Sequence, residues 1–223
     1  MHAFLDRALD LALPARCVGC GREGAPLCPT CEPALDARVG LPAGTPLCLP
    51  ADIPEPLLQL EWCAPFAGSV RRALHELKYG GERRLAEPLG KAVARRWRRA
   101  GAGGDILVPV PVHADRARKR GYDQAALIAH VAARELRLPM GPVLERARAT
   151  IAQFDLDRVH RATNVEDAFR LKPGARNAKP LAGRWVVLID DVVTTGATLA
   201  ACAKTLHAAG AVGVSAVTVA RER

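Results

Sequence analysis

Two adjacent carboxylates followed by small hydroxyl residues form the segment of the sequence that could do the most specific chemistry. Asp190 and Asp191 follow the apolar run 185–189, and a threonine-rich segment around Gly196 leads into the candidate helix 198–209. A glycine turn at a helix start presents backbone N–H groups and the positive end of the helix dipole to a phosphate, and threonine hydroxyls add donors. Two carboxylates repel a phosphate, so we expect sugar hydroxyls to lie between them. The alternative interpretation is an ordinary turn in which Asp190 caps the helix.

Four cysteines near the amino end form a second group that could do chemistry. Cys17, Cys20, Cys28 and Cys31 follow the pattern C-x2-C-x7-C-x2-C. Each C-x2-C pair can present two thiolates from a tight turn, and two pairs complete a closed tetrahedral site suited to a structural Zn²⁺. A redox pair and an iron–sulfur cluster are the alternatives. A closed four-thiolate site leaves no position for a substrate, so its expected role is to fold the small segment around it.

A basic segment follows the candidate buried strand 106–112. Residues 113–124 precede the candidate helix 125–136, and we expect them to form a loop that holds Arg116, Arg118, Lys119 and Arg120. Guanidinium groups beside a helix start suit a pyrophosphate, so this loop is a second candidate anion site. A merely solvated basic loop is the alternative.

The charge of the chain is distributed unevenly. The 223 residues carry a net charge of +9, yet residues 1–60 hold four Lys and Arg against seven Asp and Glu, and residues 61–223 hold 28 against 16. This asymmetry favours a polyanionic ligand or partner, with a solvated basic face as the alternative. No apolar run approaches the roughly 20 residues of a membrane span. The amino terminus lacks the layout of a signal peptide, and we expect a cytoplasmic protein.

The alternation of strand-like and helix-like segments predicts an α/β protein with a parallel sheet. We expect a four-cysteine segment with a proline-rich linker or irregular wrap over residues 1–60 and the main domain over residues 61–223. The long connection 145–169 is expected to be a mobile flap that closes over a charged ligand. The remaining expected elements are helices at 1–12, 69–77 (capped by Ser69) and 85–97 and strands at 61–66, 142–144, 185–189 and 214–220.

Several ordered motifs accompany the acid pair and the cysteines. They are Leu77-Lys78-Tyr79-Gly80, Val110 to Val112, Arg120 to Gln124, Arg146 to Gln153, Arg161 to Phe169 and Asp190 to Thr198. In these motifs the sequence resembles the ComF family, phosphoribosyltransferase-like proteins that include competence proteins for DNA uptake. The resemblance covers nearly the whole chain. It implies a type I phosphoribosyltransferase-like parallel sheet flanked by helices, with a small N-terminal zinc-knuckle domain.

The resemblance also implies a ligand, phosphoribosyl pyrophosphate (PRPP), and residues that bind it. Asp190 and Asp191 would be the catalytic pair. The implied PRPP contacts are Asp190, Asp191, Val192, Thr194, Thr195, Gly196, Ala197 and Thr198; the pyrophosphate loop holds Arg118, Arg120 and Gly121, and the flexible loop holds Gln153, Arg158 and Arg161. The family more often has Phe and Asn where Tyr122 and Asp123 stand. The extra carboxylate of Asp123 could pair with an arginine of that loop or help to place Mg²⁺.

Three functions remain open from the sequence. In the first, the protein binds PRPP with Mg²⁺ and transfers its phosphoribosyl group to a nitrogenous acceptor, although no acceptor pocket can be recognised. In the second, a non-catalytic protein of the uptake or recombination machinery tracks single-stranded DNA with basic segments around residues 71–120, and its PRPP site is a ligand-binding or vestigial site. Tyr79, Trp97 and Tyr122 are then the candidate stacking residues. In the third, residues 1–60 dock a DNA-uptake helicase or another competence protein.

Overall fold

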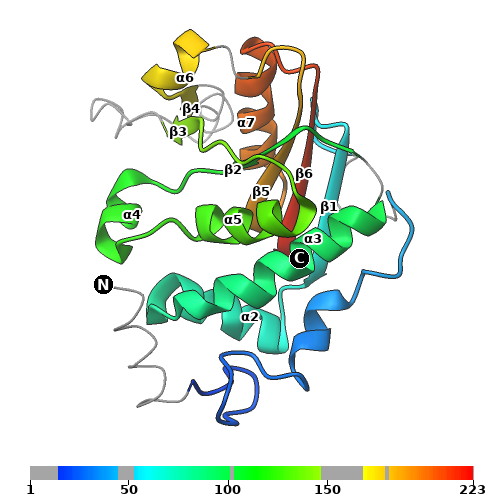
Figure 1. The fold of residues 1–223 in the computed structure, drawn as a ribbon, viewed down its shortest axis with the longest axis vertical. Coiled ribbons are helices and arrows are strands. Elements are labelled where there is room, and N and C mark those ends of the chain that lie inside the picture. Colours follow the sequence, from blue (N-terminus) through cyan, green and yellow to red (C-terminus); the bar gives the residue numbers. More distant parts are fainter. Residues whose placement is uncertain (1–14, 45–52, 101–102, 147–167, 179–180, 223) are drawn as a thin grey trace, which may run out of the picture.

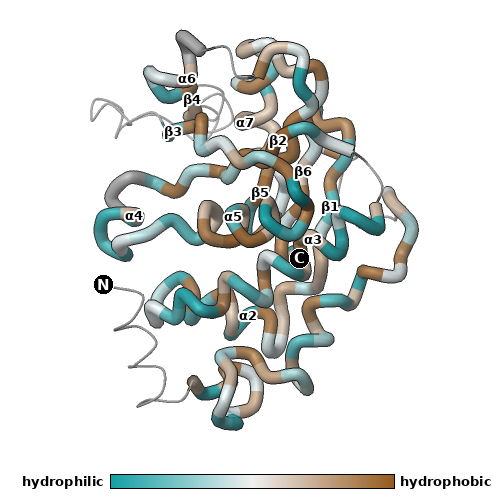
Figure 2. Tube along the Cα trace, in the orientation of Figure 1, coloured by the Kyte–Doolittle hydropathy of each residue, from teal (hydrophilic) through white to brown (hydrophobic). Residues whose placement is uncertain are grey.

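A four-stranded parallel sheet forms the centre of the computed structural model, which describes residues 15–44, 53–100, 103–146, 168–178 and 181–222 (Figure 1). The strand order is β1-β6-β5-β2, so the two longest strands are central. Both are largely buried and mostly apolar, as is typical of strands covered on both faces (Figure 2). The predicted parallel sheet is thereby confirmed. Its strands are β1 (Gln59–Pro65), β2 (Ile106–Pro109), β5 (Trp185–Val193) and β6 (Gly213–Arg221).

Helices cover both faces of the sheet. Val187 and Ile189 of β5 belong to the hydrophobic cluster of α2, α3 and α5, whereas Val186 and Leu188 belong to the cluster of α7. Successive side chains of a strand point to opposite faces, so β5 is sandwiched between the two helical layers. The helices are α2 (Gly68–His75), α3 (Ala86–Ala100), α5 (Gln124–Leu136) and α7 (Ala197–Ala208).

Helix α2 differs from its prediction at both ends. Its N-cap is Ala67, without a side-chain cap hydrogen bond, so the assignment of Ser69 as the N-cap is wrong. The helix begins at Gly68, shortly after the end of β1 at Pro65. At its other end α2 continues into the π-helical turn η2 (Glu76–Gly80), which ends at Gly81 with φ 75°. A short 3-10 turn, η3 (Arg83–Leu85), then leads into α3.

A small antiparallel sheet stands apart from the main one. It pairs β3 (Leu144–Arg146) with β4 (Phe169–Leu171), and the short helix α6 (Pro173–Ala178) follows it. The predicted strand 142–144 is therefore placed two residues too early. Only the two ends of the predicted flap are described, and residues 147–167 lie outside the described part of the chain. The predicted helix 1–12 lies outside it as well.

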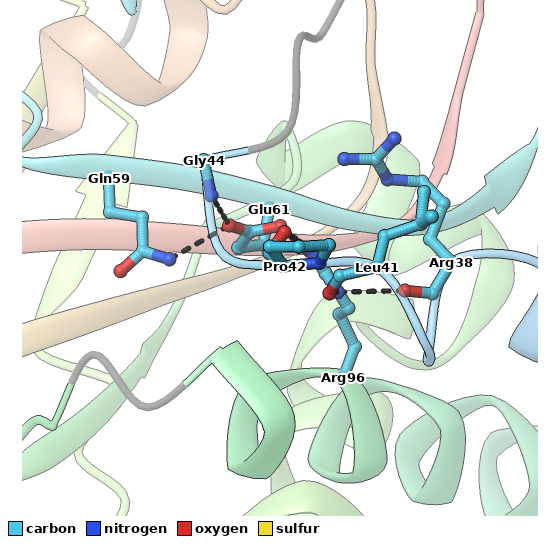
Figure 3. A network of polar contacts seen from close by, with 7 residues as sticks. All are labelled: Arg38, Leu41, Pro42, Gly44, Gln59, Glu61 and Arg96. Carbon is cyan, nitrogen blue, oxygen red and sulfur yellow. Dashed lines mark hydrogen bonds and ion pairs between the residues drawn. The ribbon is translucent and has the colours of Figure 1, made fainter.

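A buried ion pair fastens the segment after the cysteines to the main sheet. The short 3-10 helix η1 (Glu32–Asp36) leads into residues 38–44, which pass over β1 and α3. Arg96 of α3 and Glu61 of β1 form an ion pair with side chains 1% and 0% exposed (Figure 3). The predicted irregular wrap is thus anchored to the sheet over part of its length.

The anchoring hydrogen bonds come from both members of this pair. The Arg96 guanidinium donates to the carbonyl oxygens of residues 38, 41 and 42 at 2.7, 2.6 and 3.2 Å. The second carboxylate oxygen of Glu61 accepts from the N–H of Gly44 at 2.9 Å and from the side-chain amide of Gln59 at 2.8 Å. The buried charges are therefore surrounded by hydrogen-bonding groups, as buried ions must be.

Other cations of α3 are also partnered within the protein. Arg95 Nε donates to Asp36 Oδ1 at 2.9 Å, and Arg98 donates to the carbonyl of Glu135 at 2.7 Å. Lys91 pairs with Glu87 at 3.0 Å. Much of the basic end of α3 therefore holds the fold together, and this helix offers less charge to an external polyanion than its sequence suggested. Among the described residues, no helix combines the length and apolarity needed to cross a membrane.

Candidate functional site

The acid pair lies inside β5 rather than after it. The predicted strand ended at residue 189, but pairing with β6 continues through Asp190 opposite Thr218 and ends at Val193. Because neighbouring side chains alternate, Asp191 shares the face of Ile189, toward α2, α3 and α5. Asp190 shares the opposite face, toward α7. The two carboxylates thus occupy different environments at the carboxyl edge of the sheet, where ligands of open α/β sheets bind.

Asp191 is held by a lysine that sequence reasoning assigned no role. The carboxylate is buried and forms an ion pair with the ammonium group of Lys78 on η2, whose side chain is 20% exposed. A motif around Lys78 was noticed in the sequence, but the approach of η2 to the end of β5 depends on the tertiary fold. The ion pair offsets the negative charge of Asp191 inside the site.

Asp190 is partly buried and has an unusual electrostatic environment. Its Oδ1 accepts the N–H of Asp191 at 2.8 Å. Burial, followed by the negative charge of Asp191, raises the pKa of the Asp190 carboxyl well above its usual range. The ionised carboxylate of Asp190 therefore has few hydrogen-bond donors and little positive charge around it. Sugar hydroxyls or a cation would supply these.

The segment between β5 and α7 has the geometry of an anion-binding turn. Gly196 is the N-cap of α7 in a left-handed conformation with φ 81° and offers no side chain to cap the helix. Thr195 Oγ1 accepts the N–H of Ala197 at 3.4 Å. The other N–H groups of the first turn lack intrahelical partners, so the helix start leaves donors for a ligand. Thr194 and Thr195 are exposed, as is Ala197, whereas Val192 and Thr198 are partly buried. The fold thus brings the predicted phosphate-binding residues together.

Pro54, in the segment before β1, lies against Gly196 of this turn. A Cβ atom on Gly196 would lie only 2.6 Å from Cγ of Pro54, so the close approach of the two segments requires glycine there. The positive φ adds a second reason for glycine. Residues some 140 positions apart in sequence therefore determine the shape of one turn.

The basic segment is a short helix, not the predicted loop. Helix α4 (Ala114–Arg120) carries the predicted pyrophosphate residues in its last turn, and Gly121 ends it with φ 76°. Arg118 is exposed, and Arg120 donates to Gln124 Oε1 at 2.9 Å. The guanidinium of Arg120 also lies over the ring of Tyr79, 4.8 Å from its centroid. Since η2 also carries Lys78, this contact joins α4 to the turn beside the acid pair.

Asp123 has a structural role that replaces the two roles considered from the sequence. Its Oδ1 accepts the N–H of Ala126 and caps α5, and its Oδ2 accepts the N–H of Val112, both at 3.1 Å. The carboxylate is therefore occupied by backbone donors. The predicted flexible-loop residues Gln153, Arg158 and Arg161 lie outside the described residues.

The four cysteines come together as predicted and could hold a metal ion. The sulfur atoms of Cys17, Cys20, Cys28 and Cys31 all lie within 4.8 Å of one another, and those of Cys20 and Cys28 are 3.6 Å apart. Tetrahedral zinc with Zn–S bonds of about 2.3 Å needs sulfur–sulfur distances of about 3.8 Å. The donor set and its spacing fit Zn²⁺.

Local geometry supports the cysteine cluster. Gly19 is required because a Cβ there would lie 2.6 Å from the sulfur of Cys31. Burial raises the pKa of the Cys17 thiol, but N–H groups that include those of Cys28 and Gly19 outweigh it and lower this pKa to about 6. Burial and the neighbouring cysteines raise the pKa of Cys31 to about 12. Such crowding of thiolates is what a divalent cation relieves.

The fold and the site define the chain as a parallel α/β protein with a left-handed glycine turn and an acid pair at the carboxyl edge of its sheet. No protein-family model matches the chain. The DNA utilization protein YhgH of Escherichia coli K12 is 33% identical over 205 residues, which cover 89% of this chain and 85% of the relative. Competence protein F of Haemophilus influenzae is 36% identical over 107 residues, covering 48% and 45%. The chain belongs to the family of these proteins, and the predicted membership of the ComF family is confirmed.

Solved structures with a similar fold include two enzymes that are much longer than this chain. The allosteric regulatory enzyme of purine biosynthesis matches with a TM-score of 0.41 and 21% identity, over 60% of this chain and 25% of the enzyme. Glutamine PRPP amidotransferase from B. subtilis, complexed with ADP and GMP, matches with a TM-score of 0.42 and 19% identity, over 60% and 26%. The chain thus spans about a quarter of each enzyme.

Proposed function

We propose that the protein binds PRPP, together with Mg²⁺, at the carboxyl end of β5. The observation that supports this most strongly is the order of groups along the chain: an acid pair, exposed threonines, a left-handed glycine and a helix start. In this proposal the turn from Thr194 to Thr198 holds the 5′-phosphate through backbone N–H groups and hydroxyls. Asp190 and Asp191 accept hydrogen bonds from the ribose hydroxyls. A 5-phosphorylated ribose carries a phosphate for the turn and hydroxyl groups for the acid pair.

Cations around the site complete the proposal. Lys78 offsets the charge of Asp191 and so reduces the repulsion that the acid pair exerts on a phosphate. Arg118 and Arg120 at the end of α4 would interact with the pyrophosphate group. Mg²⁺, which prefers oxygen ligands, would offset the negative charge of the pyrophosphate. Gln153, Arg158 and Arg161 are assigned to closure over the ligand from the family motif alone.

Phosphoribosyl transfer is a separate step that the bound ligand would permit. An acceptor nitrogen would form a bond to C1 of the ribose while the bond from C1 to the pyrophosphate oxygen breaks. Pyrophosphate leaves with the electron pair of that bond, and the acceptor nitrogen loses its proton. The donors around the leaving group would stabilise its charge. Release of pyrophosphate during an acceptor screen would detect this reaction.

Calorimetric titration with PRPP and Mg²⁺ tests the binding proposal. We expect binding by the natural sequence and its loss in Asp190→Asn/Asp191→Asn. Asp105→Asn is the matched control, because Asp105 accepts the N–H of Trp185 at the opposite end of β5, at 2.7 Å. This variant removes a carboxylate charge from the residue before β2, at the other edge of the sheet, and should bind PRPP normally. No heat of binding in the natural sequence would rule out the proposal.

We propose that the cysteine cluster holds structural Zn²⁺. Arg72 of α2 donates to the carbonyl oxygens of Val18 and Gly19, both at 2.9 Å. These bonds fasten the cluster to the main fold. A redox function would need cysteines that are free to react, whereas a closed set of four thiolates favours a permanent metal ligand set. Metal analysis of protein purified without added zinc tests this assignment.

The relatives named for DNA utilization and competence support a role in handling DNA. We propose that role at the level of the family, with a DNA-uptake helicase or another competence protein as the kind of partner. Backbone contacts with single-stranded DNA would weaken steeply as the salt concentration rises. The internal partners of Arg95, Arg96 and Arg98 mean that such contacts are more readily supplied by α2 and α4 than by α3. A binding isotherm measured at several salt concentrations tests this role.

A further inference from the structure

An exposed aromatic ring lies beside the proposed PRPP site. Tyr79 on η2 is 67% exposed. Among the Phe, Trp and Tyr residues in the described part of the chain, it is the one that is largely open to solvent. Trp97, a candidate stacking residue from the sequence, is instead 3% exposed and donates to the carbonyl of Gly103. Leaving a large ring in water contributes little to folding, so its surface is available for a ligand.

Two tyrosine–arginine contacts link the same segments, and they differ in character. Tyr122 is partly buried, lies under the guanidinium of Arg83 at 4.6 Å, and donates its hydroxyl to the carbonyl of Leu77. This pair holds η2 and η3 against the start of α5. Tyr79 lies under Arg120 at 4.8 Å, and its hydroxyl has no hydrogen-bond partner in the described part of the chain. The contact between Tyr122 and Arg83 therefore stabilises the fold, whereas the ring of Tyr79 remains exposed to solvent.

The surroundings of Tyr79 suit a ligand that carries phosphate groups. The ring of His75 lies 5.0 Å from that of Tyr79 at 49°, and His75 also borders a cleft of about 680 Å³ between α2 and the cysteine segment. Clefts of this size hold small ligands. Its lining includes three arginines, Arg16, Arg71 and Arg72, and two carboxylates, Glu76 and Glu82. On its other side Tyr79 faces α4, whose last turn is wholly basic.

We propose that Tyr79 and Arg120 form a stacking site for an unpaired nucleobase whose phosphate lies along the neighbouring arginines. Aromatic rings and guanidinium planes both stack on bases, and neither requires a particular base sequence. Lys78, the preceding residue, forms an ion pair with Asp191, so the base would lie at the edge of the proposed PRPP site. Two sources share this chemistry, a free nucleotide and a single strand.

Fluorescence anisotropy with a labelled thymidine strand of about ten nucleotides tests the proposal, in buffer without PRPP or Mg²⁺. Tyr79→Ala should weaken binding about 5- to 150-fold, as loss of one base–aromatic stack does. Tyr79→Phe, which keeps the ring, should bind as the natural sequence does. Tyr79→Ala and the natural sequence should bind an abasic strand of equal length with the same affinity. Leu58→Ala is the matched control, because Leu58 is also largely exposed, at 57%, but pairs with the start of β6.

Competition with thymidine monophosphate identifies the source of the base. If the nucleotide displaces the strand and also loses affinity in Tyr79→Ala, the site takes a free nucleotide. If Tyr79→Ala weakens binding of the strand but not of the nucleotide, the site takes a base within a single strand. Equal binding of the strand and the nucleotide by Tyr79→Ala and the natural sequence would overturn the proposal, as would no binding of either ligand. Because PRPP is absent, failure here leaves the separate calorimetric result on PRPP unaffected.

Discussion

Breaking the buried ion pair between Arg96 and Glu61 should destabilise the whole protein and release the segment 38–44 from the sheet. Removing one partner of a buried pair leaves an uncompensated charge and typically costs about 3–5 kcal/mol. In Arg96→Met the three carbonyls that accepted hydrogen bonds from the guanidinium also lose their donor, although those near the surface can regain water. We therefore expect a loss of about 4 kcal/mol, a large share of the roughly 5–15 kcal/mol by which domains are stable.

The pairwise character of the interaction gives a sharper test. Glu61→Gln keeps an acceptor for the N–H of Gly44 but leaves the charge of Arg96 unpaired, so it should cost a similar amount. Because both substitutions remove the same interaction, Arg96→Met/Glu61→Gln should cost less than the sum of the two by about 2 kcal/mol or more.

Urea unfolding curves measure these free energies, and hydrogen exchange at the amide of Gly44 reports on the segment. Arg99→Met is the control, since this nearby arginine of α3 is exposed and should change stability by only about 0.5 kcal/mol. A loss below about 1 kcal/mol in Arg96→Met, or strict additivity in the double variant, would refute the reasoning.

Three further predictions concern the two candidate sites. Asp190→Asn should stabilise the protein at pH 7 by about 1 kcal/mol in thermal unfolding, because the raised folded pKa makes the ionised carboxylate unfavourable. This gain should shrink as the pH falls through the folded pKa toward the ordinary value of 3.8, and an unchanged gain at low pH would contradict it. Gly19→Ala should weaken zinc binding by about tenfold or more in a chelator competition, since the methyl group collides with Cys31. Gly196→Ala should lower the calorimetric affinity for PRPP at least about tenfold, since Pro54 blocks the methyl group and φ is positive.

Local patterns in the sequence predicted most of the fold. The apolar run 185–189 and the helix after Gly196 have their expected types, because burial on both faces and helix-start chemistry leave clear local signals. The cysteine spacing likewise predicted the cluster. One error concerns the end of an element: β5 runs to Val193 because β6 extends beside it. A second error is a missed element, since residues 114–120 form a helix where only a basic loop was expected.

Contacts between distant segments could not be predicted from the sequence. Lys78 and Asp191 are more than one hundred positions apart, and nothing near either residue indicates the other. The basic run in α3 suggested a polyanion surface, yet Arg96 turns inward to Glu61, where hydrogen bonds compensate its burial. Asp123 similarly suggested a charge partner, whereas the start of α5 needed a cap. For Lys78 and Arg96 the tertiary fold decided the use of the charged side chain, whereas the cap by Asp123 is a local contact three residues along the chain.

The most direct test of the proposed function is a calorimetric titration of the natural sequence with PRPP in the presence of Mg²⁺, repeated on Asp190→Asn/Asp191→Asn and on Asp105→Asn. The proposal predicts stoichiometric binding that is lost in the double variant and kept in the control. Absence of binding by the natural sequence, or equal binding by all three proteins, would contradict the assignment of this site to PRPP.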